Sequence, residues 1–339
     1  MKCLLRRPQS CFSVIPIISI SVFLASCSQA SLLNEKAFVV PEQLKLKSST
    51  APASRVVGEL KSGDEVLVIG RVSSGDGTAW SQVKAPGVET GWVESFHLVK
   101  GEIVTQSRKI ADEIKDTPTQ AIGKSKARLK LRLTPDRTSD DNVATMLPSG
   151  TTLEIVARER KPRPATLDAR SETAPEAQDP KVRYDDWYKV RLKDYAILPA
   201  GWIYGGSVEL DVPPEIVYFG SAGRRITGWQ KIGTVTGDDS KTGDHYLALE
   251  RKILGADERI DFDRIKVLAY DPYSRNYSTP FREDVQGRFP ITLKMEGTRG
   301  RFRLIVIDKG GQEQELVYGI EMLEGGKVRV IKPQKKGQE

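Results

Sequence analysis

A block of strand signals occurs twice in this chain of 339 residues, and the repeat restricts the fold more than any other feature. Residues 44–47 alternate apolar and basic side chains, and residues 129–132 repeat that alternation. The Trp-Ser-Gln-Val run at 80–83 is matched by Trp-Tyr-Lys-Val at 187–190. Alternation over short runs predicts strands with one buried face, so the repeat predicts two similar small all-β domains.

The first copy, residues 44–100, contains short strand signals separated by turns rich in Gly, Ser and Asp, which is the pattern of a small barrel. Its parts are a Leu-Lys-Ser-Gly-Asp turn at 60–64, the Trp-x-x-Val strand at 80–83 and a closing Gly-Trp-Val strand at 91–93. In this order and spacing they resemble the bacterial Src-homology-3-like domain, which occurs on many exported and cell-wall proteins.

The second copy, residues 125–211, has the same parts but is longer. Leu147 corresponds to Leu60 at an offset of 87 residues, whereas Trp187 corresponds to Trp80 at an offset of 107. The extra residues fall in 158–186, where charges and prolines are frequent and large apolar side chains are almost absent. Such a composition predicts a disordered insertion. It is either a binding arm or a tolerated surface insertion.

The two copies are joined by residues 101–124, in which Ile110, Ala111 and Ile114 recur at helical spacing among charged residues. This spacing predicts a short amphipathic helix over 107–115, followed by a flexible linker.

Residues 214–339 differ in pattern from both copies. Turns containing Gly or Pro separate six strand signals, at 245–253, 262–270, 288–293, 301–307, 315–320 and 327–331. Short strands with turns at this spacing predict a β-sandwich, and no specific family is indicated. The predicted fold class is therefore all-β: two small Src-homology-3-like barrels, a short helical linker between them, and a C-terminal β-sandwich.

The N-terminus reads as an export signal. Lys2, Arg6 and Arg7 precede an uncharged run over 11–25, which is the layout of a signal peptide. The run ends in Leu24-Ala25-Ser26-Cys27, which resembles the lipobox of bacterial lipoproteins. That resemblance implies cleavage after residue 26, acylation of Cys27, and a tether over 27–43.

Two acyl chains suffice for stable attachment, at about 0.8 kcal/mol per buried methylene. A simple secreted protein and an uncleaved membrane helix are the alternatives, although the apolar run is short for a span. Ser28 follows the cysteine where an aspartate would, in Gram-negative lipoproteins, direct retention at the inner membrane. The resemblance therefore implies an outer-membrane anchor facing the periplasm, if the source is Gram-negative, and otherwise the outer face of the cell membrane.

The sequence contains few residues that could serve in a catalytic site. The lipobox resemblance implies that Cys3 and Cys11 leave with the signal and that Cys27 is acylated, so no thiol would remain for a disulfide, a nucleophile or a metal. The two histidines, His97 and His245, lie in different domains and cannot make a zinc site together. No Gly-x-Ser-x-Gly elbow is present.

The densest acidic group, at Asp257, Glu258, Asp261 and Asp263, lacks the spacing of a calcium loop and is expected to be a solvated turn. We therefore expect a protein that is not an enzyme and has no metal or other cofactor.

Aromatic residues are the candidate ligand contacts. They fall on matching strands of the two copies, and the candidates are Trp80, Trp92, Trp187, Tyr188, Trp202 and Tyr204. Aromatic-lined grooves bind peptides in domains of the Src-homology-3 type. Trp92 and Trp202 also suit a barrel core, whereas Tyr188 and Tyr204 alternate with Trp187 and Ile203 and are expected on an exposed face.

The formal net charge of +7 is spread along the chain. Nucleic acid is not an expected partner for an exported protein. The positive charge is instead suited to binding anionic envelope polymers or lipid headgroups. The sequence favours a membrane-anchored protein that binds peptidoglycan or its peptide stems through its barrels. The alternative is a scaffold that holds a partner protein in an envelope assembly.

Overall fold

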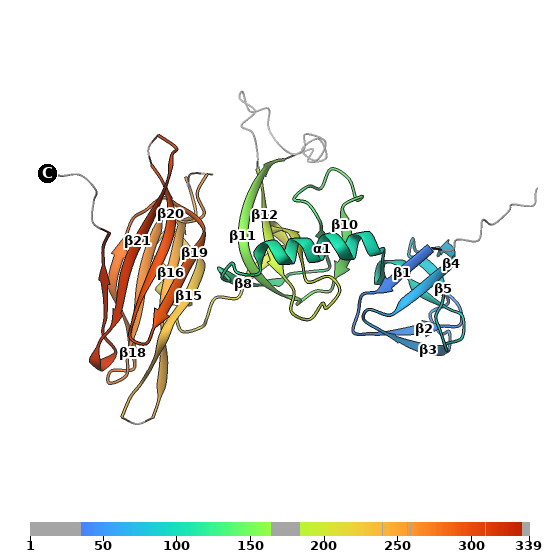
Figure 1. Cartoon of the computed structure of the whole chain (residues 1–339), viewed down its shortest axis with the longest axis horizontal. Coiled ribbons are helices and arrows are strands. Elements are labelled where there is room, and N and C mark those ends of the chain that lie inside the picture. The colour runs from blue at the N-terminus through green and yellow to red at the C-terminus, as the bar shows by residue number, and fades with distance from the viewer. Residues whose placement is uncertain are drawn as a thin grey trace, which may run out of the picture.

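The computed structural model describes residues 35–163, 184–238, 240–255, 257, 259–308 and 310–333. Among these residues the regular structure is almost entirely antiparallel β-sheet, with one α-helix and a few single-turn 3-10 helices. Figure 1 shows three units in a row: a first barrel, a second barrel with the helix lying along it, and a sandwich. The predicted all-β fold class with one short helix is confirmed. The signal peptide and Cys27 lie outside the described residues.

The first barrel is a seven-stranded sheet of order β3-β2-β6-β5-β4-β1-β7. Its elements are β1 (Glu35–Val39), β2 (Gln43–Lys47), β3 (Val56–Lys61), β4 (Glu65–Ser73), β5 (Ala79–Lys84), β6 (Gly91–Glu94), η1 (Ser95–His97) and β7 (Leu98–Val99). Leu44 and Leu46 of β2 are buried, and Lys45 and Lys47, which alternate with them, are not, as the alternation predicts.

The second barrel repeats this topology strand for strand, with the order β10-β9-β13-β12-β11-β8-β14. Its elements are β8 (Ala121–Ser125), β9 (Leu129–Arg132), β10 (Val143–Leu147), β11 (Thr152–Pro162), β12 (Tyr184–Arg191), β13 (Ala200–Tyr204), η2 (Gly205–Ser207) and β14 (Val208–Leu210). The match extends to single pairs, because Lys47 faces Trp92 as Arg132 faces Trp202.

Each copy of the repeat begins one strand earlier than the sequence boundaries. The residues assigned to the tether, 27–43, include β1, and the residues assigned to the linker, 101–124, include most of β8. Each of these strands pairs with the longest strand of its own barrel, β1 with β4 and β8 with β11. They are short and only partly apolar, so their own sequences give a weak strand signal.

The prediction that 158–186 is disordered is wrong at both ends. Residues 158–162 complete β11 and residues 184–186 begin β12, and Arg158 and Arg160 pair in register with Tyr188 and Asp186. The charges that suggest disorder satisfy one another across this ladder, since both arginines bind Asp186 at 2.7 Å. Residues 164–183 lie outside the described residues.

The helix α1 (Gly101–Ile114) starts six residues before its predicted beginning. Its buried residues are Val104, Ser107, Ile110 and Ile114, one stripe along the helix. The stripe lies on the second barrel, where the Ser107 hydroxyl donates to the Ala200 carbonyl at 2.6 Å. Val99, at the end of the first barrel, and Val104, in the first turn of α1, both pack against the core of the second barrel. The start of α1 therefore connects the two barrels through apolar contacts.

The C-terminal unit is a sandwich of two four-stranded meanders, β15-β16-β17-β18 and β19-β20-β21-β22. After the single turn η3 (Val217–Phe219), its elements are β15 (Arg224–Thr236), β16 (Thr242–Lys252), β17 (Arg264–Asp271), β18 (Asn276–Glu283), β19 (Gly287–Glu296), β20 (Arg299–Ile307), β21 (Glu313–Met322), η4 (Glu324–Gly326) and β22 (Val328–Ile331). Both sheets supply its core, in which Phe302 and Tyr318 stack with centroids 4.7 Å apart.

One edge of the sandwich is closed by Gln120, which is fully buried just before β8. Its side-chain oxygen accepts from the Ile291 amide at 2.7 Å, and its side-chain nitrogen donates to the Ile291 carbonyl at 3.0 Å. Its own carbonyl accepts from the Trp229 amide at 2.8 Å. A single residue therefore satisfies backbone groups of both edge strands, β15 and β19, at the junction with the second barrel.

The same junction contains a buried ionic network. The Arg158 guanidinium donates to Asp186 and to Asp261, each at 2.7 Å, and Asp261 also accepts from the Phe289 amide at 2.8 Å. Asp261 is buried, so the expectation of a solvated acidic turn is wrong at this residue. The long-range partner on β11 explains its burial, because a buried carboxylate needs a cation and donors.

Candidate functional site

A groove on the second barrel brings together basic side chains from β9 and the segments flanking it with aromatic side chains from β12 and β13. Its volume is about 240 Å³. We call it the basic groove, and the residues that line it are Arg128, Leu129, Lys130, Arg132, Arg137, Met146, Trp187, Tyr204 and Ser207. Four of these side chains are cationic and none is a carboxylate, so the wall of the groove attracts anions.

The aromatic wall of the basic groove is made by Trp187 and Tyr204. These residues face each other across β12 and β13, and their rings meet edge to face with centroids 6.0 Å apart. Trp187 is only 1% exposed and supports the wall from beneath. The Arg137 guanidinium lies over the Tyr204 ring, 4.4 Å from its centroid, which is a favourable cation–π geometry.

Arg137 is held in place by a carboxylate behind it. Its Nε and Nη2 donate to the two oxygens of Asp185 at 2.6 and 2.9 Å. The Asp185 side chain is 1% exposed, whereas that of Arg137 is 26% exposed. A bidentate pair of this kind fixes the plane of the guanidinium. The stacked Arg137 and Tyr204 therefore form a preorganised surface.

Lys130 and Arg132 share one carboxylate. Lys130 Nζ lies 2.5 Å from Asp140 Oδ2, and Arg132 Nη2 lies 2.9 Å from Asp140 Oδ1. Hydrogen bonds from Lys130 and then Arg132 lower the pKa of Asp140. Arg132 also donates to Asn142 Oδ1 and to the Ser139 carbonyl. Two cations against one anion leave a positive charge at this wall.

Arg128 is the most accessible cation of the groove. It is exposed and forms no ion pair with any residue that the structure describes. Its guanidinium carbon lies 4.5 Å from the centroid of the Phe96 ring, which belongs to the first barrel. Arg128 also lines an adjoining hollow of about 200 Å³. Burial and then the charge of Arg128 lower the pKa of His97, in that hollow, to about 4.

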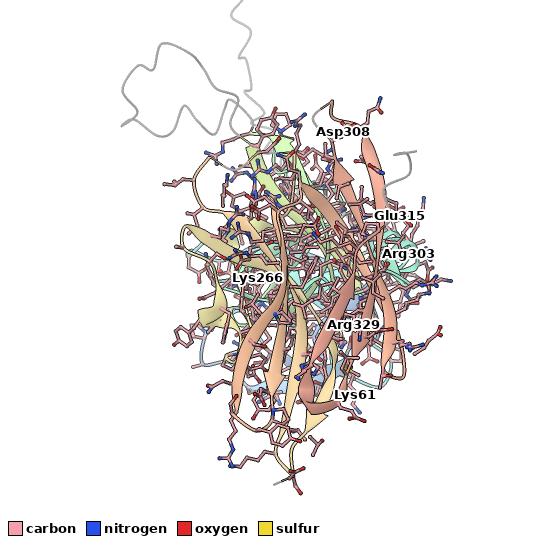
Figure 2. All side chains as sticks on the ribbon, turned by 90° about the vertical axis from the view of Figure 1, so that its left-hand side faces the viewer. Lys61, Lys266, Arg303, Asp308, Glu315 and Arg329 are labelled. Atoms are coloured by element: carbon pink, nitrogen blue, oxygen red, sulfur yellow. The ribbon has the colours of Figure 1, made fainter. Side chains whose placement is uncertain are left out.

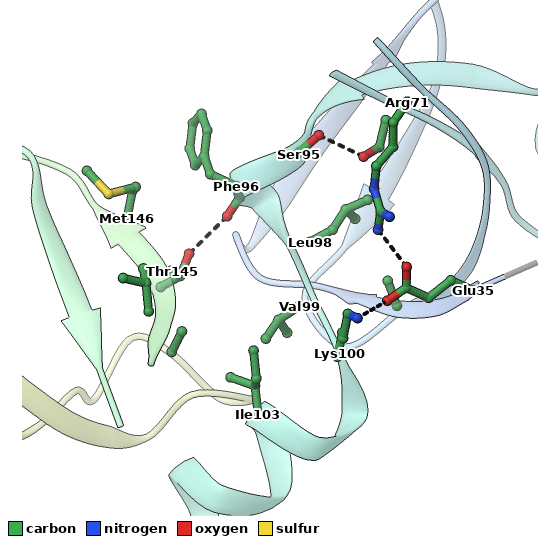
Figure 3. Close-up of a pocket in the computed structure, with 14 residues that line it drawn as sticks. Glu35, Arg71, Ser95, Phe96, Leu98, Val99, Lys100, Ile103, Thr145 and Met146 are labelled. Atoms are coloured by element: carbon green, nitrogen blue, oxygen red, sulfur yellow. Dashed lines mark hydrogen bonds and ion pairs between the residues drawn. The ribbon is translucent and has the colours of Figure 1, made fainter. Parts of the chain in front are cut away.

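A further hollow of about 240 Å³ lies between the two barrels, as Figure 3 shows. Glu35 accepts from Arg71 at 2.7 Å and lies 2.7 Å from Lys100 Nζ. These cations, Lys100 first, hold the pKa of Glu35 below its usual value. The Thr145 hydroxyl donates to the Phe96 carbonyl at 3.0 Å across the seam. Because Glu35 occupies both cations, this hollow is less suited to an anion than the basic groove.

The predicted aromatic residues do not form one surface. Trp187 and Tyr204 lie in the basic groove, whereas Trp202 is packed beneath α1 with Ile110 and Ile114. Tyr188 points to the other face of β12 and is half-buried, not exposed as expected. Burial raises the pKa of its hydroxyl group. This face of β12 is the inner face of the barrel, where Tyr188 packs against the second-barrel core that contains Val190 and Ile203.

In the first barrel, Trp80 and Trp92 share a sheet face, since Trp80 pairs with Glu94 and Trp92 is its diagonal neighbour. Trp80 is buried, and the Lys47 ammonium lies 5.4 Å from its ring centroid. Trp92, expected in the core, is half-buried.

The aromatic pattern alone misses the cations of the basic groove. The alternation over residues 129–132 places Lys130 and Arg132 on one side of a strand and could have indicated them. Arg137 follows in a loop, and Asp185 falls within the segment predicted to be disordered. Their pairing over 48 residues has no local sequence signal.

Among the described residues, no set of three or more His, Cys, Asp or Glu side chains is placed to hold a metal ion. In the same part of the chain, no helix has the length and apolar character needed to cross a membrane.

No protein-family model matches the chain, and no curated protein sequence matches it. Among solved structures, the chain has a distant likeness to NlpC2 from Trichomonas vaginalis, with 13% identity and a TM-score of 0.16. The match covers 53% of this chain and 49% of that chain, so it spans about half the length of NlpC2. A likeness this low carries no argument about fold or function.

Proposed function

We propose that the chain is a non-enzymatic, lipid-anchored protein of the bacterial cell envelope that binds the peptide stems of peptidoglycan in the basic groove. The observation that carries the proposal is the composition of that groove: four cations and two aromatic rings, with no carboxylate on its wall. Stem peptides are short, extended and rich in free carboxylates, so their chemistry is complementary to this wall.

The roles within the groove follow from the contacts. Arg128 and Lys130 are the cations that a carboxylate can approach, and Arg132 supports the wall because its side chain is only 7% exposed. Arg137 and Tyr204 offer a flat surface for peptide planes or sugar rings. A guanidinium already fixed in its plane loses little conformational freedom when a ligand stacks on it.

The proposed anchor places the barrels near a membrane. Glu35, where β1 begins, lies eight positions after Cys27. A chain of eight residues spans at most about 28 Å when it is fully extended. With Cys27 acylated, the first barrel therefore stays close to the lipid headgroups, and we propose the outer membrane facing the periplasm as its location in a Gram-negative cell.

The test is retention of the fragment Ser28–Glu339 on purified sacculi at low and moderate salt. Tyr204→Leu removes the stacking surface, which is worth about 0.5–1.5 kcal/mol, so we expect about twofold to twelvefold weaker binding. Arg128→Glu reverses the accessible charge and should weaken binding further. Lys124→Glu, at an exposed position on β8 of the same barrel, makes the same charge change away from the groove and is the matched control.

The outcomes separate specific from non-specific binding. Salt-resistant retention that Tyr204→Leu and Arg128→Glu weaken, and Lys124→Glu does not, supports the proposal. Equal effects of the two charge reversals, with retention lost in salt, would show only that a basic surface meets an acidic polymer. Absence of retention would favour the alternative, a protein-interaction scaffold in an envelope complex.

A further inference from the structure

The two edges of the sandwich differ in whether their backbone groups have hydrogen-bond partners. The β15 and β19 edge is closed by Gln120, whose side chain and carbonyl satisfy backbone groups of both strands. At the opposite edge, β18 and β22 are terminal in their sheets, and no described strand pairs with them from outside. An edge strand with free backbone groups is a template for another chain.

A groove of about 570 Å³ lies between these two terminal strands. Its apolar lining comes from both sheets and includes Ala269, Phe281, Val328 and Val330. Side chains that enter between the sheets at this point would extend the sandwich core, which includes Val328 and has Phe281 packed against it. The opening therefore offers apolar contacts as well as a strand edge.

The register shows which backbone groups are free. The Leu323 amide donates to the Lys327 carbonyl at 2.7 Å, so these two residues, which adjoin the facing ends of β21 and β22, form a hydrogen-bonded pair at the turn. Such pairs alternate with non-hydrogen-bonded pairs along an antiparallel ladder. The next pair, Met322 with Val328, is therefore non-hydrogen-bonded, and so is the pair that contains Val330. The N–H and C=O groups of Val328 and Val330 thus point out of the sheet edge.

The opposing strand, β18, is a less complete hydrogen-bonding edge. Pro280 lies within it and lines the groove. Proline has no N–H to donate, and within sheets it occurs on edge strands with its nitrogen facing outward. The missing donor makes β22 the more complete edge for an added strand, whose side chains would reach across toward β18.

Charge selects the kind of strand that fits. Lys327 is exposed and forms no ion pair with a described residue, and the Arg329 side chain is 61% exposed with Glu321 3.7 Å away. The acidic residue of the groove, Asp271, already accepts from the Tyr273 amide and the Ser274 hydroxyl. A second copy of this chain paired through β22 would bring like charges together, which is destabilising.

We infer that β22 is a docking edge for an extended segment of another protein, in which apolar residues that enter the groove alternate with acidic residues that face Lys327 and Arg329. The segment adds as a further strand, with main-chain hydrogen bonds to Val328 and Val330. Figure 2 views the molecule from the sandwich end, with Arg329 labelled. The inference is independent of the basic groove, since it involves no residue of the barrels.

The test uses the isotopically labelled chain from Ser28 and a synthetic nine-residue peptide of alternating valine and glutamate. At a peptide concentration ten times Kd, exchange of the Val328 and Val330 amide hydrogens should slow about tenfold. The Arg329 amide, already bonded to β21, should change little. A peptide of alternating valine and lysine is the control ligand and should bind at least about tenfold more weakly, which corresponds to about 1.4 kcal/mol.

Two variants locate the site. Val330→Pro removes an outward N–H without breaking a bond to β21 and should abolish the protection of Val328. Exchange of the buried Phe302 amide checks that the sandwich remains folded. Lys327→Glu with Arg329→Glu should reverse the preference between the two peptides, because both positions are exposed and the change is electrostatic. Arg303→Glu, exposed on β20 (Figure 2), is the matched control and should leave binding unchanged.

Three results would overturn the inference. One is the absence of binding by the valine–glutamate peptide. Another is binding that leaves the exchange of Val328 and Val330 unchanged. The third is slower exchange at these amides when protein concentration alone is raised, because the occupant would then be a second copy of the chain.

Discussion

Gln120 provides the sharpest test of how the second barrel and the sandwich are joined. In Gln120→Ala the Ile291 amide loses its acceptor, whereas the Ile291 carbonyl keeps the Gln230 side chain as a donor at 2.7 Å. A buried N–H left without a partner costs about 1–3 kcal/mol. Loss of the bonds to the Ile291 and Pro118 carbonyls adds to this. We expect a total of about 2–4 kcal/mol.

Amide exchange at Ile291 measures this cost locally, because unfolding of a chain with several domains is not two-state. A change of 2–4 kcal/mol corresponds to about 30- to 700-fold faster exchange. The matched control is Gln230→Ala, which removes one of two donors to the Ile291 carbonyl and orphans nothing. It should cost only about 0.5–1.5 kcal/mol.

A second variant tests the direction of the bond. Gln120→Glu keeps the size of the side chain but turns a carboxylate toward two carbonyls. Burial raises the pKa of such a group, so protonation as the pH falls restores a donor and exchange at Ile291 should slow again. Equal effects of Gln120→Ala and Gln230→Ala, or unchanged exchange at Ile291, would refute the reasoning.

Two further predictions concern stability. Arg158→Met removes the shared cation of Asp186 and Asp261, and breaking such a buried pair costs about 3–5 kcal/mol; faster amide exchange at Phe289, whose N–H donates to Asp261, should show the loss at pH 7, and Arg303→Met at an exposed site should not. Burial lowers the pKa of His97 to about 4 from about 6.5 in the unfolded chain, so the folded state disfavours protonation. Its contribution is complete above pH 6.5 and declines as the pH falls toward 4. The stability difference between the parent and His97→Gln should follow that decline, and a difference that is constant from pH 4 to pH 7 would contradict it.

Local pattern predicts the strands that are half-buried with alternating side chains. Residues 44–47 and 129–132 show this, because Leu44 and Leu131 are buried and the intervening basic residues reach the surface or a groove. Within the sandwich, the pattern misses two strands, for different physical reasons. Glycines and two register shifts interrupt β15, and β18 is an edge strand with mostly exposed polar residues.

The contacts that connect the second barrel to the sandwich cannot be predicted from local sequence patterns. Gln120 bonds to Ile291 over a separation of 171 residues, and Arg158 reaches Asp261 over 103. A polar residue in a linker and an arginine in a charged segment have ordinary sequence contexts. Their roles exist only when the second barrel and the sandwich meet. The charged composition of residues 158–163 therefore predicts side chains exposed to solvent, whereas in the fold Arg158 is buried against carboxylate partners.

The two barrels share one topology but expose different surfaces, because different segments pack against them. In the second barrel, Ile110 and Ile114 of α1 cover Trp202, and what remains open of the aromatic face is the end at Tyr204, where Arg137 stacks. In the first barrel, the equivalent Trp92 stays half-exposed. A ligand contact therefore cannot be transferred from one copy to the other by alignment alone. The segment that packs on each sheet decides which of its aromatic residues are available for binding.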